Sequence, residues 1–387
     1  MGKSQNGTQF TRRERYSGKY PKAFREKYKE LRGDHDVIEK VKAKGSTPAG
    51  QHIPIMLDEC LEVLRLTKFN STKPLIAVDC TLGFGGHAAK VLEALQRRPG
   101  SIFIGVDQDP TELPRTESRL RELIPEKSTT KIHIKHLNFA NISEYLKMLG
   151  AYGQVDVLLA DLGFSSMQVD NSSRGFSYKA DGPLDMRMNN TPSSQSTTAL
   201  SLLESISRKN LVRILEENSD ETMPLVIANA LLGYSEEGKG SSKASGTHSV
   251  RDVPKTTLQL RKRVEKGCLA YLKGAGQSQL TASEVKQEVD AAIARTMQAL
   301  RIEVNQEFAA LEGLLDALPG ILRPGGGRAA VLTFHSGEDR RVKKSFKGRF
   351  KEGVYSRWSE MDGSTPLIRA SEEERRNNPR SKCAKLR

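Results

Sequence analysis

Long apolar runs are absent from this sequence of 387 residues. No stretch approaches the roughly 18 consecutive apolar residues that a membrane-spanning helix needs. The polar, basic start lacks the apolar core of a secretory signal, and Asn6 stands where a myristoylation signal requires Ser or Thr. We therefore expect a protein without a membrane partner.

Cysteine is also scarce, with four residues (Cys60, Cys80, Cys268 and Cys383) that lie far apart and form no C-x-x-C pair. The seven histidines are scattered and show no metal-ligand spacing. The pattern predicts no metal site and no disulfide framework, and it fits a reducing compartment.

Positive charge is abundant instead: the net charge is +14 and the pI is near 9.5. Such an excess favours a polyanionic partner, although many soluble proteins are basic without a specific reason. Residues 1–50 hold 13 Lys and Arg against 6 Asp and Glu, interleaved with Tyr16, Tyr20, Phe24 and Tyr28. This basic N-terminal arm is interpreted either as an RNA contact or as a surface-draped segment.

Short apolar runs separated by helical patterns begin at residue 52. They predict buried strands at 75–79, 102–107, 155–161 and 329–334, and a weak alternation at 131–138 predicts a further strand, which makes five in all. Continuous apolar strands that alternate with helices are typical of a parallel sheet covered on both faces. The fold class is therefore predicted as α/β.

A stretch of more than 100 residues separates the fourth predicted strand from the fifth. It contains a polar loop (168–195), helical patterns, and a Gly/Ser/Lys-rich segment that is predicted to be a disordered loop (233–250). Apolar residues from Val285 to Leu311 keep the spacing of one long amphipathic helix. We expect a core in two parts, 51–167 and 296–387, with an inserted lid and helical domain over 168–295.

A glycine-rich turn follows the first predicted strand, with the spacing G-x-G-G at 83–86 and then His87. Glycines here let the backbone approach a nucleotide-like ligand, but the spacing differs from the G-x-G-x-x-G of dinucleotide folds. Asp107 ends the second strand, where an acid accepts hydrogen bonds from ribose hydroxyls. The combination fits a dehydrogenase or a methyltransferase, and Asp107 alone could also be a helix-capping residue.

Asp161 ends the fourth strand and is followed by hydroxyl and amide side chains, among them Ser165, Ser166 and Gln168. At the carboxyl end of a strand, these groups are placed to hold adenine, a sulfonium or a target base. Phe139, just after the third strand, could stack on adenine, but from the residues alone ordinary core packing is favoured.

Several ordered motifs resemble the ribosomal RNA small-subunit methyltransferase H (MraW) family from about residue 46 to the end, apart from roughly 233–280. The motifs are His52-Ile53-Pro54-Ile55-Met56, Thr81-Leu82-Gly83-Phe84-Gly85-Gly86-His87, Val106-Asp107-Gln108-Asp109-Pro110, Asp161-Leu162-Gly163-Phe164-Ser165-Ser166-Met167-Gln168, Arg174-Gly175-Phe176-Ser177-Tyr178, Asp181-Gly182-Pro183-Leu184-Asp185-Met186-Arg187-Met188, Gln298-Ala299-Leu300-Arg301-Ile302, His335-Ser336-Gly337-Glu338-Asp339-Arg340, Asn378-Pro379-Arg380 and Ala384-Lys385-Leu386-Arg387.

The resemblance implies a class I (Rossmann-like) methyltransferase core with an inserted helical domain. It further implies S-adenosyl-L-methionine as cofactor, small-subunit ribosomal RNA as partner, and methylation of cytidine N4 near the decoding centre. The cofactor contacts that it implies are Gly85, Gly86, His87, Asp107, Phe139, Asp161 and Gln168. The sequence departs from the family pattern at Gly337, where Leu is common, at Phe164, and in the 233–250 loop.

Cytosine N4 is a poor nucleophile, so alignment and exclusion of water are the main tasks predicted for the site. Asp161 and the loop that contains Ser165 and Ser166 are the candidate acceptors for the amino hydrogens. Residues 174–188 are interpreted as a lid over an unstacked base, with Asp185 and Arg187 in polar contacts there. An internal Asp–Arg pair that only holds the loop is the alternative. His335 is placed to touch base or phosphate, or to order its own loop.

Other functions stay open at this point: a nicotinamide dehydrogenase, a methyltransferase on another RNA, on DNA or on a small molecule, and a non-catalytic RNA-binding ribosome assembly factor. The G-x-G-G spacing argues against the dehydrogenase. The absence of an Asp/Asn/Ser-Pro-Pro-aromatic motif after the fourth strand argues against the DNA enzymes. The expected location is the cytoplasm for a bacterial protein, or a mitochondrion or chloroplast for a eukaryotic one. A homodimer is compatible with the sequence.

Overall fold

The computed structural model describes residues 54–67, 72–191, 196–234, 252–274, 280–356 and 367–387. Residues from Ile53 to Arg387 form one compact unit. The basic arm (1–50) and nearly all of the 233–250 loop lie outside the described residues. None of the helices in the described ranges combines the length and the apolar character that a bilayer crossing requires.

Seven strands form one sheet in the order β3-β2-β1-β4-β5-β7-β6. The five predicted strands are all present, and they run parallel to one another. Their bounds are Ile76–Asp79 (β1), Ile102–Asp107 (β2), Lys131–His136 (β3), Val157–Asp161 (β4) and Arg328–Thr333 (β5). The order reverses after β1, because β2 lies on one side of it and β4 on the other. This reversal creates the crevice at the carboxyl ends of the strands where ligands of α/β proteins bind.

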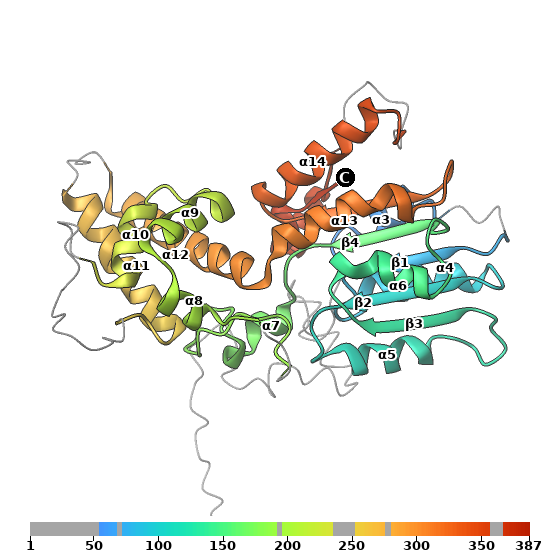
Figure 1. Cartoon of the computed structure of the whole chain (residues 1–387), viewed down its shortest axis with the longest axis horizontal. Helices are drawn as coiled ribbons and strands as arrows, with labels where there is room; N and C mark the ends of the chain where they lie inside the picture. The colour runs from blue at the N-terminus through green and yellow to red at the C-terminus, as the bar shows by residue number, and fades with distance from the viewer. Residues whose placement is uncertain (1–53, 68–71, 192–195, 235–251, 275–279, 357–366) are drawn as a thin grey trace, which may run out of the picture. The chain divides into compact units, whose positions relative to one another are not determined.

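Helices cover both faces of the sheet, as the continuous apolar strands predict (Figure 1). Side chains alternate across β4: Val157 and Leu159 pack with one core cluster, and Leu158 packs with the other. The first cluster includes residues of α3 (Leu57–Val63), α4 (Gly86–Gln96) and α5 (Leu113–Glu122). The second includes residues of α6 (Ile142–Met148), α13 (Glu307–Ile321) and α14 (Ser336–Lys351). The α/β fold class is thereby confirmed.

Two short antiparallel strands extend the sheet beyond β5 and were not predicted. β7 (Lys385–Leu386) pairs with β5, and β6 (Ile368–Arg369) pairs with β7. Each has two residues, which is too short for an alternating pattern to be visible in a sequence. They bring the Ala384-Lys385-Leu386-Arg387 motif against β5, with Leu386 fully buried.

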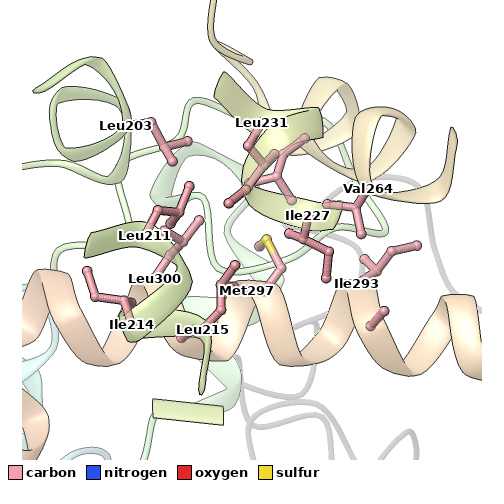
Figure 2. Close-up of a cluster of buried hydrophobic side chains, with 14 of the residues drawn as sticks. Leu203, Leu211, Ile214, Leu215, Ile227, Leu231, Val264, Ile293, Met297 and Leu300 are labelled. Atoms are coloured by element: carbon pink, nitrogen blue, oxygen red, sulfur yellow. The ribbon is translucent and has the colours of Figure 1, made fainter. Parts of the chain in front are cut away.

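The insertion between β4 and β5 builds a separate hydrophobic core from five helices (Figure 2). They are α8 (Ala199–Ser205), α9 (Arg208–Ser219), α10 (Pro224–Leu232), α11 (Thr257–Gly274) and α12 (Ala282–Asn305). Figure 2 shows Met297 and Leu300 of α12 reaching toward Leu211 and Leu215 of α9. Burial of each such side chain contributes about 1.5–3 kcal/mol, so this cluster holds the insertion together without help from the sheet.

The single long helix expected over 285–311 is wrong. Gln306 adopts a left-handed conformation (φ 51°) that ends α12 and begins α13. The preceding Asn305 donates from Nδ2 to the Met186 carbonyl (2.8 Å) and accepts from the Met188 N–H (2.7 Å). Because these partners are more than 110 residues away, periodicity alone does not reveal the break. The expected domain boundary at 295/296 falls inside α12, whose residues up to Val304 pack in the insertion core.

Two glycines let the segments 172–175 and 182–185 pack backbone against backbone. A Cβ at Gly175, where φ is 73°, would lie 2.2 Å from the Pro183 carbonyl oxygen. A Cβ at Gly182 would lie 1.8 Å from the Ser172 carbonyl oxygen. The Arg174-Gly175 and Asp181-Gly182 pairs noted in the sequence are therefore explained by one close contact of two chain segments.

Replacing Gly175 by alanine is expected to lower the free energy of unfolding by about 3 kcal/mol or more, because left-handed strain and a backbone clash act together. Gly150 is the matched control, since its φ is 67° but a Cβ there meets nothing within 4 Å. Gly150→Ala should cost only about 1 kcal/mol. Urea titrations of both variants measure the difference; equal losses would contradict the close packing.

Candidate active site

Three acidic residues end neighbouring parallel strands and so lie along one edge of the sheet: Asp79 on β1, Asp107 on β2 and Asp161 on β4. Asp79 pairs in register with Gly105 of β2 and with Leu159 of β4. The site therefore gathers at the topological switch point, where the sequence predicts it.

The glycine turn is fastened to the end of β2. The Gly83 N–H donates to Oδ2 of Asp107 (2.6 Å), and the Thr116 hydroxyl donates to the Gly83 carbonyl (2.8 Å). Gly85 is the N-cap of α4 with a φ of 81°, and a Cβ there would lie 2.9 Å from the Thr116 side chain. Gly86 opens the helix. The predicted turn is thus a close backbone cradle that a larger residue would fill.

Asp107 accepts a second hydrogen bond, from the Asp109 N–H (2.8 Å). Desolvation nevertheless raises its pKa to about 6, although these two hydrogen bonds work in the opposite direction. Asp107 as a whole residue is half-buried. It remains able to accept hydrogen bonds from a ligand in the crevice, and its contact with ribose stays a prediction.

Asp79 ends β1 at the same edge and was not predicted as a site residue from the sequence. Its side chain is buried at 2% exposure and accepts one hydrogen bond from the Thr81 N–H. Burial raises its pKa to about 6, and the charges of Asp161 and Asp107 add to this direction. The available signal was its position, because it ends a strand just before the glycine turn as Asp107 and Asp161 end theirs.

Asp161 carries an oxygen without a partner. Its N–H donates to the Thr81 hydroxyl (2.7 Å), and its Oδ2 lies 3.6 Å from Nδ1 of His87. Oδ1 is covered and has no hydrogen-bond partner among the described residues. Burial, followed by the charge of Glu338, raises the pKa of Asp161 to about 7. A buried acceptor left unpaired in this way is costly unless a ligand completes it.

The His87 ring faces the protein interior. It is 7% exposed, its Nε2 lies 3.1 Å from the Ile55 carbonyl oxygen, and burial lowers its pKa. A carbonyl only accepts, so the neutral ring carries its hydrogen on Nε2. The predicted cofactor contact of His87 is then left to its backbone at the start of α4, and it stays a prediction.

Ser165 and Gln168 form a capping box at the start of α7 (Ser166–Asp170). The Ser165 N–H donates to Oε1 of Gln168 (2.9 Å), and Nε2 of Gln168 donates to Asp109 (2.7 Å). Ser166 is the first residue of the helix. All three residues lie just after the end of β4. The side-chain amide of Gln168 is already engaged in hydrogen bonds to Ser165 and Asp109 that hold the loop. Their contacts with cofactor or base are untested.

Arg174 joins the 174–188 segment to the loop that follows β2. Its Nη2 lies 2.9 Å from Oδ2 of Asp109, and the pair is largely buried at 8% and 12% side-chain exposure. The same guanidinium donates to the Arg187 and Met188 carbonyls (3.0 and 2.9 Å). Breaking one partner of such a pair costs about 3–5 kcal/mol, so the lid base is firmly held. Arg174 belongs to a motif recognised in the sequence, but its pairing with Asp109 was not predicted.

Asp185 and Arg187 pair with each other through two hydrogen bonds of 2.8 Å. These bonds lower the pKa of Asp185 although burial opposes them. Between the two lies Met186, fully buried and left-handed at φ 60°. The pair keeps about a fifth to a quarter of its side-chain surface exposed. Asp185 and Arg187 therefore do form the internal ion pair that was the alternative to a lid role. A contact of this pair with the base stays a prediction.

His335 is the N-cap of α14 and follows β5 at the same edge. Its Nε2 lies 3.2 Å from Oε1 of Glu338, its Nδ1 has no hydrogen-bond partner among the described residues, and its ring lies 5.8 Å from that of Phe308. A Cβ at Gly337 would lie 2.6 Å from the Phe308 ring, which explains the glycine at this position. Glu338 links His335 to Asp161 electrostatically and was also missed from the sequence.

Phe139 begins the short 3-10 helix Phe139–Asn141 (η2) after β3 and packs, partly buried, against the second core cluster. Core packing is thereby seen, and stacking on adenine stays a prediction. Among the described residues, no group of three or more His, Cys, Asp or Glu side chains is arranged to hold a metal ion.

The donor set fits a cationic, hydroxyl-bearing ligand. Asp79, Asp107 and Asp161 have raised pKa values, and Oδ1 of Asp161 lacks a partner. A positive centre and ribose hydroxyls would stabilise all three carboxylates in their charged form. S-adenosylmethionine carries both, whereas a dinucleotide would add a pyrophosphate to an edge already rich in acids.

Comparisons with known proteins identify the family of this chain. A family model described as the MraW methylase family matches residues 49–387. The chain is 41% identical over 380 residues to "Ribosomal RNA small subunit methyltransferase H 1" of Lachnoclostridium phytofermentans, covering 97% of this chain and 92% of that protein. A relative from Alkaliphilus metalliredigens, "Ribosomal RNA small subunit methyltransferase H 2", is 40% identical over 97% of this chain and 96% of its own. "Ribosomal RNA small subunit methyltransferase H" of Prochlorococcus marinus (strain NATL2A) is 35% identical, covering 87% and 93%.

Proposed function

Since the chain belongs to the MraW methylase family, whose members are S-adenosylmethionine-dependent methyltransferases, we propose that it methylates N4 of a cytidine in small-subunit ribosomal RNA near the decoding centre. Relatives named for small-subunit ribosomal RNA support the substrate. The observation that carries the chemistry is the unpaired Oδ1 of Asp161 at the strand edge. Such an enzyme works where ribosomes are made: the bacterial cytoplasm or an organelle.

The residues that would hold the cofactor are the turn at Gly83–Gly86 and the acids Asp79 and Asp107. When bound, S-adenosylmethionine supplies an electrophilic methyl group on a sulfonium. The backbone of the turn allows close approach because Gly85 has no Cβ, and Asp107 offers carboxylate oxygens to ribose hydroxyls.

Asp161 has the features of an acceptor for the amino hydrogens of the base. The lone pair of cytosine N4 is delocalised into the ring, and a hydrogen bond from the amino group to a carboxylate favours its nucleophilic form. A proton leaves N4 once the methyl group is attached, and an acid with a pKa near 7 can take it at neutral pH. Asp161 thus serves alignment first and proton removal second.

We infer that the 174–188 segment excludes water from the base. It is fastened at Arg174 by Asp109 and at Met186 and Met188 by Asn305. A lid held at both ends keeps Asp185 and Arg187 on a fixed backbone beside the crevice. We infer that this pair contacts the unstacked cytidine from one side. His335, which directly follows β5, would contact the base from the other side.

Labelled cofactor incubated with unmethylated small ribosomal subunits tests the proposed function. The label is expected on N4 of one cytidine, found by nuclease digestion and mass spectrometry. Asp161→Asn should bind subunits but transfer methyl on the order of 10²-fold more slowly, because the acceptor is lost. Label on another RNA, or none with a protein that binds the cofactor, would overturn the proposal.

Asp185→Ala and Arg187→Ala should separate cofactor binding from catalysis. Neither residue touches the glycine turn, so S-adenosylmethionine affinity by calorimetry should stay within a few-fold of the unchanged protein. Single-turnover methylation of subunits should fall by roughly 10²-fold, as expected when a positioning group is lost. Arg213→Ala, which breaks an exposed pair with Glu217, is the control. Near-normal turnover in both lid variants would reduce the pair to loop structure.

A further inference from the structure

Helix α14 carries a one-sided row of lysines that the proposed chemistry does not use. Lys343, Lys344, Lys347 and Lys351 are all exposed. None has a hydrogen-bond or ion-pair partner within the part of the chain that the structure describes. The arginines of the same helix differ: Arg340 pairs with Asp220, Arg341 pairs with Glu312, and Arg349 lies near Asp316 and Glu352. The four lysines are thus left with uncompensated charge.

These lysines share a face with the residues that reach the helical insertion. At 100° per residue, Ser336, Arg340 and the four lysines fall within an arc of roughly 100°. Ser336 and Arg340 both bond Asp220, the C-cap of α9, at 2.6 and 2.8–3.0 Å. The lysines therefore lie on the same face of α14 as the two residues that connect this helix to the helical insertion.

Helix α14, which carries the row, starts at the reacting edge. Glu338, in its first turn, is buried on the side of the helix opposite the lysines and lies close enough to Asp161 to raise its pKa. Along the axis, Lys343 lies about 7.5 Å beyond Glu338 and Lys351 about 19.5 Å beyond it, at 1.5 Å per residue. Successive lysines at 343, 347 and 351 are about 6 Å apart. A row with this spacing and origin suits a strand that leaves the site with regularly placed negative charges.

Resting on the proposed function, we propose that the lysine row of α14 (343, 344, 347 and 351) binds the phosphates of the ribosomal RNA strand on one side of the target cytidine. Lysines on a rigid helix act as point charges that set the register of the backbone without reading its bases. The opposite side of α14 is occupied by Val342 and Phe346, which pack on the core, so the row is held in one orientation. Its role is substrate positioning, and it leaves cofactor binding alone.

A triple variant, Lys343→Gln/Lys347→Gln/Lys351→Gln, tests this assignment. The matched control is Lys127→Gln/Lys131→Gln/Lys135→Gln, which removes three exposed lysines in and before β3, at the opposite edge of the sheet. Both triples change the net charge equally. Binding to unmethylated small subunits is measured across a salt series, together with steady-state methylation and cofactor affinity.

For the α14 triple, the slope of log affinity against log salt should fall by about 2, at roughly 0.7 per lost phosphate contact. KM for subunits should rise on the order of ten-fold, while kcat and cofactor affinity stay within about two-fold. The control should keep the wild-type slope. An unchanged slope in the α14 triple, or equal losses in both triples, would overturn the assignment. If the unaltered protein binds subunits but transfers no methyl group, the proposed function fails while the two slopes still decide the row.

Discussion

Negative charge held away from water at the carboxyl edge of the sheet is the constraint on which the rest of this structure depends. Asp79, Asp107 and Asp161 end adjacent parallel strands, and burial raises their pKa values to about 6, 6 and 7. Backbone N–H groups donate hydrogen bonds to Asp79 and Asp107, and His87, whose pKa is lowered by burial, lies near Asp161. Among the described residues, no Lys or Arg side chain forms an ion pair with any of the three acids. Such an arrangement is unfavourable in the empty protein and favourable once a positive ligand is present. The buried acids therefore favour the binding of a positively charged cofactor.

The surrounding elements keep that edge in place and open to a second, larger substrate. The capping box at Ser165 and Gln168 and the ion pair of Arg174 with Asp109 connect the end of β4 to the end of β2. The insertion has its own apolar core, so it can carry a lid without drawing on the packing of the sheet. Asp220 then ties α9 to the start of α14. The cofactor would thus bind at the edge of the sheet, the base under the 174–188 segment and the RNA backbone along α14.

Much of the framework was predictable because its signals are local. The run at 102–107 is short, apolar up to Val106 and ends in an acid, and β2 has the same bounds. The parallel arrangement then places Asp107 and Asp161 at one edge without further information. The two-residue strands β6 and β7 and the break at Gln306 were not predictable, because pairing with β5 and contacts of Asn305 with the lid decide them.

Side-chain partners within the site were also beyond local reasoning. The reciprocal bonds of Ser165 and Gln168 satisfy the spacing of a capping box, yet the same residues fit a ligand site equally well in a sequence. Asp185 and Arg187 lie two residues apart, and only the left-handed Met186 between them brings their side chains together. Asp79 ends a strand just before the glycine turn, but in the sequence this position does not distinguish it from any other acid at the end of a strand.

Proton release on cofactor binding tests the central claim, that buried carboxylates recognise the positive charge of S-adenosylmethionine. At a pH of about 6.5, part of the Asp161, Asp79 and Asp107 population is protonated, and a bound cation lowers their pKa values and expels protons. Calorimetry in buffers of different ionisation enthalpy counts these protons. The account predicts net release that exceeds the release with S-adenosylhomocysteine, whose sulfur is uncharged, and that shrinks toward a pH of about 8.5, where the acids are already ionised. Equal proton counts for the two ligands at the lower pH would contradict it.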